Sequence, residues 1–234
     1  MLAFSSSKKS VTVISLGGST VVPEVPDGKF VKSFCELIRE RVKAGRRFVI
    51  VVGGGRTSRN YHQALRDAGN ADQDDGDWIG IYATHLNAEL LRLALGKLAH
   101  PDIVKDPTKR TAWKSAVLVG GGWKPGRSTD YDAVLLAEMF GAKNLVNVSN
   151  IDYVYTADPK KDPSARPLPQ MKWSELIAML PTEWSPNLSA PFDPIAAKIA
   201  EKQKLSVSIV NGSSLADVSR ALDGEPFKGT IITP

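Results

Sequence analysis

The sequence Phe48-Val49-Ile50-Val51-Val52-Gly53-Gly54-Gly55-Arg56 decides the fold of this chain. Its five apolar residues form a continuous run that is typical of a parallel strand covered on both faces. Three glycines follow at once, and a helix is predicted over residues 56–68. A glycine turn between a strand and a helix lets backbone N–H groups approach an anion, and the helix dipole adds partial positive charge. The stretch therefore predicts an anion site at one edge of a parallel sheet.

Two further glycine turns repeat this arrangement. Gly17-Gly18-Ser19 follows an apolar run over residues 11–16, and Gly120-Gly121-Gly122 follows another over residues 116–119. A single glycine turn is weak evidence, because glycine often serves only a tight turn. Three such turns after predicted strands indicate more than one phosphate-bearing group at the carboxyl edge of a single sheet, where ligands of α/β sheets bind.

Predicted strands and helices alternate along the rest of the chain, which predicts an α/β fold with a mostly parallel sheet. Residues 72–77 are predicted to form an acidic turn before a long helix over residues 79–98. Residues 156–170 predict an exposed loop or hairpin, and residues 181–194 predict a mobile loop. The other predicted helices cover residues 30–43, 129–140, 173–179, 195–202 and 215–222, and the other strands cover residues 145–148, 207–210 and 230–232.

Length and composition limit the class of protein. With 234 residues and no linker or repeat, we expect one domain over residues 11–234 behind a flexible tail at residues 1–10. The net charge of +5 is spread along the chain without a ladder of basic and aromatic residues, so we expect anionic metabolites and no nucleic acid. No stretch has the length of a membrane span or the apolar core of a signal peptide, which predicts a cytoplasmic protein with no membrane partner.

The cysteine and the histidines offer no reactive cluster. Cys35 is alone, which excludes an intramolecular disulfide, and we expect it to be buried on a helix. His62, His85 and His100 lack ligand spacing and are predicted to be structural.

Residues 121–128 spell Gly-x-x-x-x-Gly-Arg-Ser, which departs from a P-loop at Arg127, where Lys belongs. Arginine does not freely replace a lysine that reaches phosphate as a point charge. A P-loop protein also uses one phosphate loop, whereas this chain has several glycine turns. A different kind of phosphate-binding loop is therefore favoured.

Charged residues at predicted helix starts give a second signal. Arg56 and Arg59 lie in a first turn, where cations are unfavourable against the helix dipole unless an anion binds there. Two solvated arginines remain the alternative. Asp130 and Asp132 are favourable in their own first turn, and capping explains one of them. The adjacent glycine loop favours a catalytic or metal-organising role for Asp130, whereas a lone helical lysine such as Lys198 is usually solvated.

Taken together, these features resemble the amino acid kinase family, and within it the short archaeal kinases that phosphorylate UMP. The similarity runs in order through nearly the whole chain after residue 10. It is carried by residues 16–19, 53–55, 59–61, 77–81, 83–88, 125–130, 150–163, 193–198 and 229–232.

The resemblance implies a single three-layer αβα domain that transfers the γ-phosphoryl group of ATP to UMP with Mg²⁺, as a homohexamer. Such chemistry depends on positioning and charge neutralisation more than on a nucleophilic side chain. The implied catalytic residues are Lys198, Asp130 and Arg59, and no metal ligand is assigned. The implied ATP-binding residues are Ser15, Leu16, Gly17, Gly18, Ser19, Gly55, Arg59, Ser149, Tyr155 and Asp158. The implied UMP-binding residues are Gly54, Asp77, Trp123, Lys124, Pro125, Gly126, Arg127, Ser128 and Thr129.

The chain departs from the family pattern at several of these positions. Many members have Lys where Ser15 stands, which leaves more of the charge neutralisation to Lys198 and Mg²⁺. Tyr153 replaces a usual Gly and would crowd the ATP entrance, while Ser149 for Thr is a mild change. Trp123 and Arg127 are unusual lining for an acceptor loop.

Two alternatives stay open. One is a kinase of the same fold with another small phosphate or carboxylate acceptor, although isopentenyl phosphate kinases expect a His where residues 56–58 have none. The other is a non-enzymatic, nucleotide-dependent oxyanion store or regulator, as in molybdenum storage proteins. Ser15 and Tyr153 favour the second alternative, whereas Lys198 and Asp130 favour catalysis. The loop at residues 181–194 precedes Lys198, and we hypothesise that it is a lid.

Overall fold

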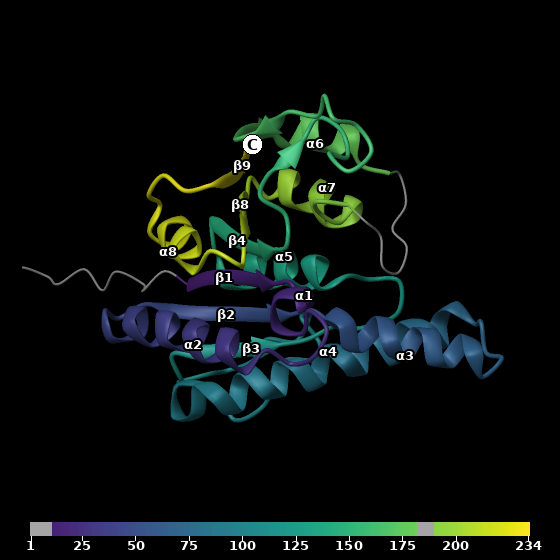
Figure 1. Ribbon diagram of the computed structural model, residues 1–234. Coiled ribbons are helices and arrows are strands. Elements are labelled where there is room, and N and C mark those ends of the chain that lie inside the picture. Colours follow the sequence, from purple (N-terminus) through teal and green to yellow (C-terminus); the bar gives the residue numbers. More distant parts are fainter. Residues whose placement is uncertain (1–10, 182–189) are drawn as a thin grey trace, which may run out of the picture.

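The computed structural model describes residues 11–181 and 190–234, in which helices pack on both faces of a seven-stranded sheet (Figure 1). The tail predicted at residues 1–10 lies outside the described residues, as does most of the loop predicted at residues 181–194. The boundaries of the single domain stay a prediction.

The sheet has the strand order β3-β2-β1-β4-β8-β9-β7. Neighbouring strands are parallel except for β8 and β9, so the prediction of a mostly parallel sheet is confirmed. A separate antiparallel pair, β5 (Val154–Tyr155) and β6 (Pro167–Leu168), forms the predicted hairpin. The strands of the large sheet are β1 (Val11–Leu16), β2 (Arg47–Val52), β3 (Val117–Gly120), β4 (Asn144–Ser149), β7 (Gln170–Lys172), β8 (Ser206–Asn211) and β9 (Gly229–Thr233).

Each face of the sheet has its own apolar core. On one face, Phe34 of α2 (Gly28–Lys43) and Leu91 of α4 (Gln73–Leu95) pack with strand residues and with α8 (Leu215–Asp223). On the other, α5 (Thr129–Phe140), α6 (Trp173–Met179) and α7 (Pro194–Lys202) pack around the fully buried Trp173. This arrangement confirms the three-layer αβα sandwich. Among the helices of the described residues, none combines the length and apolarity that a membrane span requires.

The expected acidic turn at residues 72–77 is wrong, because α4 begins at Gln73 and includes most of it. Asp72 caps this helix by accepting a hydrogen bond from the Asp75 backbone N–H at 3.0 Å. Asp74 and Asp75 then lie in the first turn, where carboxylates are favoured by the helix dipole. Asp77 therefore lies on a helix and has a fixed direction.

The chain leaves β1 toward β2 on one side, and β4 lies on the other side of β1. The order of the strands thus reverses beside the carboxyl end of β1, and α/β sheets bind ligands in the crevice that such a reversal opens. The short helix α1 (Gly18–Val21) and the helix α3 (Gly55–Asp67) both start at this edge. A 3₁₀ turn, η1 (Gly96–Leu98), follows directly after the C-terminal end of α4.

Candidate active site

The first two glycine turns lie directly against each other. The Gly53 N–H donates to the Leu16 carbonyl at 2.9 Å, which joins the ends of β1 and β2. A Cβ atom added at Gly18 would lie 2.1 Å from the Gly55 nitrogen, and one added at Gly55 would lie 2.3 Å from the Gly18 carbonyl oxygen. Gly55 also has a φ of 59°, which side chains rarely allow. The two turns therefore form one backbone surface that only glycine can build.

Asp130 lies beneath these turns at the start of α5. One of its oxygens, Oδ1, accepts hydrogen bonds from the Ser15 hydroxyl at 2.7 Å and from the Asn147 amide at 2.8 Å. The backbone N–H of Asp193 also donates to this carboxylate. Burial raises the pKa of Asp130 to about 6, while these hydrogen bonds oppose the rise. The ends of β1, β4, α5 and α7 thus converge on a single acid.

Two carboxylates hold the loop that follows the third glycine turn. Asp132 Oδ2 accepts from the Trp123 backbone N–H at 3.1 Å, and Asp77 Oδ2 accepts from the Gly126 backbone N–H at 2.7 Å. Burial raises the pKa of Asp77, and the bond from Gly126 opposes it. The loop at residues 123–128 is therefore held at two points, Trp123 from α5 and Gly126 from α4.

The same loop presents cations beside aromatic rings. The Lys124 ammonium lies 4.0 Å from the centre of the Trp123 ring, and the Arg127 guanidinium lies 5.0 Å from the centre of the Tyr131 ring. The Ser128 hydroxyl caps α5 by accepting from the Tyr131 N–H at 3.1 Å. Aromatic and cationic groups on one loop suit a ligand that carries both a ring and a phosphate. Pro125 lies within this segment, and Thr129 is the first residue of α5.

Arg59 extends from α3 toward the first glycine turn, with Nη1 3.4 Å from the Ser19 hydroxyl. It lines a cavity of about 410 Å³ together with four other polar residues of α3. Arg56 in this cavity pairs with Glu24 at 3.2 Å. The lining consists of Arg56, Arg59, Asn60, Gln63 and Arg66. A cationic wall therefore continues from the glycine turns along α3.

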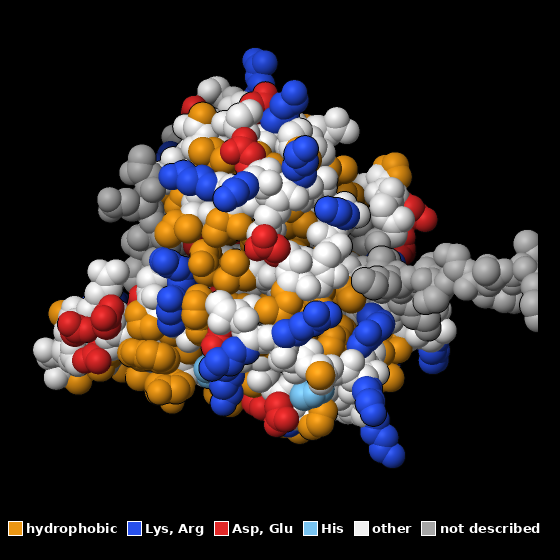
Figure 2. All heavy atoms as spheres, turned by 180° about the vertical axis from the view of Figure 1, so that it is seen from behind, with side chains coloured by type: hydrophobic (Ala, Val, Ile, Leu, Met, Phe, Trp, Pro, Cys, Tyr) orange, Lys and Arg blue, Asp and Glu red, His pale blue; other side chains and the backbone are white. Residues whose placement is uncertain are grey.

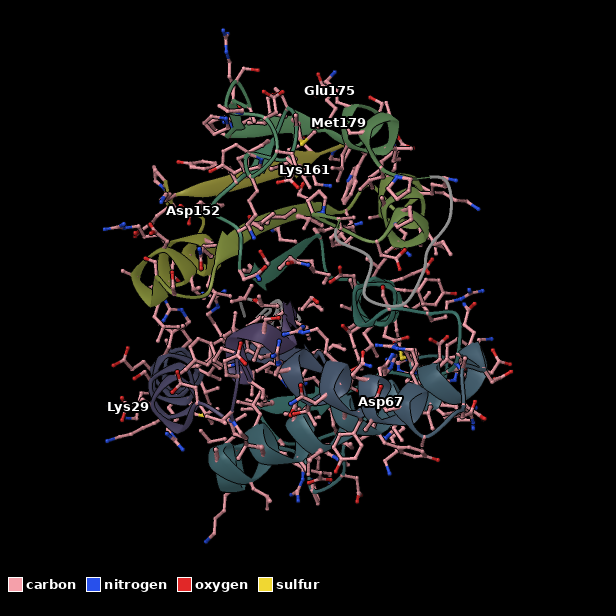
Figure 3. All side chains as sticks on the ribbon, turned by 45° about the vertical axis from the view of Figure 1, so that its right-hand side comes forward. Lys29, Asp67, Asp152, Lys161, Glu175 and Met179 are labelled. Atoms are coloured by element: carbon pink, nitrogen blue, oxygen red, sulfur yellow. The ribbon has the colours of Figure 1, made fainter. Side chains whose placement is uncertain are left out.

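The predicted adenosine-side residues lie around β4 and the β5–β6 hairpin. The Ser149 hydroxyl accepts from the Ile151 N–H at 3.3 Å, and Asp158 accepts from the Lys160 N–H at 3.0 Å. The rings of Tyr153 and Tyr155 meet edge to face at 6.3 Å. In Figure 3, Lys161 in the segment between β5 and β6 lies in the upper half of the molecule, and Asp67 at the end of α3 lies in the lower half. The site is therefore lined by segments from both halves of the chain.

Lys198 lies on α7 with its side chain exposed, and the described residues give it no hydrogen bond or ion pair. The helix is anchored by Asp193, which caps the Ile195 and Ala196 N–H groups at 2.6 and 2.8 Å. Because Asp193 also contacts Asp130, the first turn of α7 lies at the site. The structure thus brings the helix of Lys198 to the acid, and the contact of the lysine itself stays a prediction.

Several residues of this site escape sequence reasoning. Asn147 lies inside a β4 run that reads as apolar, and Asp193 reads as part of a loop. Thr84 and Asn87 lie within the long amphipathic helix predicted over residues 79–98, where polar side chains that can bond the backbone are disfavoured. For Asn147 the available signal was its position in an apolar run, but only the structure shows which segments these residues contact.

The combination of a parallel sheet, paired glycine turns at its reversal point, a buried acid and a cationic loop defines a class of phosphate-binding α/β proteins. Comparison with family models makes the assignment specific. Residues 10–211 match the model of the amino acid kinase family, and the chain belongs to this family.

Archaeal relatives agree with this assignment. The chain is 37% identical over 232 residues to the uridylate kinase of Hyperthermus butylicus, covering 96% of this chain and 99% of the relative. It is 36% identical to the uridylate kinase of Thermococcus kodakarensis, covering 95% and 99%. The crystal structure of uridylate kinase from Archaeoglobus fulgidus matches with a TM-score of 0.79 and 33% identity, over 95% of this chain and 99% of that chain. The UMP kinase structure from Bacillus anthracis, at 20% identity and a TM-score of 0.74, shares the fold.

Proposed function

We propose that this protein transfers the γ-phosphoryl group of ATP to UMP and releases ADP and UDP. The proposal rests on one observation: the joined glycine turns and the loop at residues 123–128 lie side by side at one edge of the sheet. The joined glycine turns offer backbone donors to a polyphosphate, and the loop at residues 123–128 is held in place beside them. The archaeal relatives named uridylate kinase support the choice of acceptor.

In this proposal the UMP phosphate is the nucleophile. One of its oxygens forms a bond to the γ-phosphorus, and the bond from that phosphorus to the β–γ bridging oxygen breaks. Because the attacking oxygen is already ionised near neutral pH, no side chain has to remove a proton. The protein contributes positioning and charge neutralisation, which account for most of the catalysis in phosphoryl transfer.

We assign the roles of the residues from the family resemblance. We assign the ATP phosphates to residues 15–19, Gly55 and Arg59, and the acceptor to Gly54, Asp77 and residues 123–129. Lys198 would neutralise charge on the transferring phosphoryl group. Asp130 would hold β1 and β4 in place next to the glycine turns, through its hydrogen bonds with Ser15 and Asn147. Asp77 retains a second oxygen for a ribose hydroxyl while its first holds Gly126.

Mg²⁺ fits this site as a companion of the nucleotide. Magnesium is usually held by substrate phosphates, water and one or two carboxylates. Within the described residues, no group of three His, Cys, Asp or Glu side chains is placed to bind a metal. We infer from the usual role of magnesium that the ion would arrive on ATP and neutralise charge on the phosphates. We assign it no protein ligand.

The proposal extends to an oligomer of identical chains in the cytoplasm, where its nucleotide substrates occur. Trp78, Tyr82 and Leu86 form an exposed apolar stripe on α4, with a spacing of four residues, and Tyr82 is 62% exposed. Figure 2 shows hydrophobic side chains gathered at the end of the molecule where α3 and α4 meet. Exposed patches of this kind mark interaction surfaces. We propose that a second copy covers this stripe, within the homohexamer that the family resemblance implies.

A substrate panel tests the reaction. ADP release with ATP and Mg²⁺ is measured against UMP, CMP, AMP, aspartate and isopentenyl phosphate. We expect turnover with UMP, a loss of about 100-fold or more in Lys198→Ala, and a raised KM for UMP in Asp77→Asn. Asp102→Asn, an exposed substitution, is the matched control and should retain parental rates. Tight ATP binding without turnover on any acceptor would contradict the proposal.

A further inference from the structure

The buried side of α4 carries a row of polar side chains. Asp77, Thr84 and Asn87 are separated by seven and three residues, which places them on one face of the helix. They are 6%, 7% and 3% exposed. Buried polar side chains are costly unless they are hydrogen-bonded, so the partners of this row are informative.

Each member of the row holds a different part of the site. Asp77 accepts from Gly126, as described above. The Thr84 hydroxyl accepts from the Gly122 N–H at 2.7 Å. The Asn87 amide donates twice, to the Gly53 carbonyl at 2.9 Å and to the Gly54 carbonyl at 3.0 Å. One helix therefore fixes the second glycine turn, the third glycine turn and the acceptor loop relative to one another.

The two bonds from Asn87 determine the direction of the backbone donors. In a trans peptide unit the C=O and the following N–H point in opposite directions. With the Gly53 and Gly54 carbonyls held toward Asn87 on α4, the N–H groups of Gly54 and Gly55 point away from that side chain. Glycines have the greatest conformational freedom, so this orientation needs an external constraint.

We propose that Asn87 is a positioning residue for phosphoryl transfer, because it aims the N–H groups of Gly54 and Gly55 at the nucleotide phosphates. The inference rests on the proposed function. It assigns a role to a residue that would not touch either substrate and that acts only through the peptide groups it holds.

Asn87→Leu tests the proposal by removing both donors at nearly constant volume. We expect kcat/KM to fall about 100-fold, as for a small misplacement of reacting groups, and the dissociation constant for ATP to rise. Leu91→Val is the matched structural control, since Leu91 lies one turn further along α4, is fully buried and packs in the apolar core. This variant should lose some thermal stability and keep parental kinetics.

Asn87→Asp adds a signature that lost packing would not produce. A carboxylate at this position would face two carbonyl oxygens, so the ionised form is repelled, while the protonated form can donate one hydrogen bond. We expect the ratio of variant to parental kcat/KM to rise as the pH is lowered from 8.5 to 6. This variant also serves if Asn87→Leu does not fold.

The outcomes separate this inference from the proposed function. Kinetics of Asn87→Leu equal to those of Leu91→Val, or a ratio for Asn87→Asp that does not change with pH, would overturn the positioning role. If the parental protein does not phosphorylate UMP, the proposed function fails, but calorimetric ATP affinities still decide the inference. Weaker ATP binding in Asn87→Leu than in Leu91→Val supports it, and equal binding overturns it.

Discussion

Asp132 is a buried acid that holds a loop of the site in place, and its burial makes the ionised form unfavourable. Its side chain is fully buried on α5, and within the described structure its Oδ1 has no hydrogen-bond partner. Its other oxygen fixes the start of the acceptor loop through Trp123. Burial raises the pKa of Asp132 to about 8, with the bond from Trp123 acting against this rise. The folded protein therefore favours the neutral acid.

A pH-dependent stability follows. Because the folded pKa lies above the unfolded value, the contribution of Asp132 is fully present below pH 4 and is lost as the pH rises toward 8. Asp132→Asn keeps an acceptor for Trp123 and cannot ionise. We expect the variant to gain free energy of unfolding relative to the parent as the pH rises from 5 to 8, measured by urea denaturation. A gain of equal size at both pH values would contradict this account, and Asp102→Asn should show none.

At the scale of elements, the contact between the two glycine turns leaves no room for an added Cβ atom. Gly18 starts α1 and Gly28 starts α2, so the two glycines occupy equivalent helix positions. A Cβ atom at Gly18 would meet backbone atoms of the second turn at 2.1 and 2.5 Å, whereas one at Gly28 would meet nothing within 4 Å. Backbone atoms cannot move aside as a flexible side chain can.

Gly18→Ala should therefore separate the turns. We expect it to lower the free energy of unfolding by about 1–3 kcal/mol and to weaken ATP binding at least tenfold. Gly28→Ala should be neutral or stabilising by up to about 1 kcal/mol, because alanine restricts the unfolded chain. Chemical denaturation and calorimetry give both quantities. Similar behaviour of the two variants would show that the turns are not in contact.

Elements with a strong local signal were predictable from the sequence. The run at residues 48–52, the glycine turns and helix α5 are marked by apolar patterning, special backbone residues and capping, all of which act locally. The start of α4 was not predictable, because Gln73 to Asp77 has the polarity of a turn. Contacts such as Asn147 with Asp130 join segments 17 residues apart and depend on strand order, which local patterns do not report.

At the scale of the whole molecule, the two sides of α4 have different roles. Its buried side holds the loops of the site through Thr84 and Asn87, and its outer side carries the apolar stripe at Trp78, Tyr82 and Leu86. The site residues and the proposed contact between copies therefore lie on one rigid element. The sequence predicted the layers, since these follow from alternating strands and helices, but not this double use of a helix.

The proposed oligomer gives a direct test at this scale. Tyr82→Glu places a charge in the apolar stripe, and we expect it to reduce the molar mass in solution measured by light scattering, because burying an unpaired charge is unfavourable. Val25→Glu is the control, since Val25 is 70% exposed and lies outside α4. A parental protein that is a monomer, or a Tyr82→Glu variant of unchanged mass, would contradict the proposed interface.

The central claim is that the paired glycine turns and the acceptor loop bring two nucleotides together for phosphoryl transfer. The most direct measurement follows the label from ATP carrying ³²P at the γ position, with Mg²⁺ and UMP present, by separating the products. The account predicts that the label appears in UDP in a one-to-one ratio with ADP, and that Lys198→Ala greatly slows its appearance. Label that stays in ATP, or that appears only as inorganic phosphate, would contradict it.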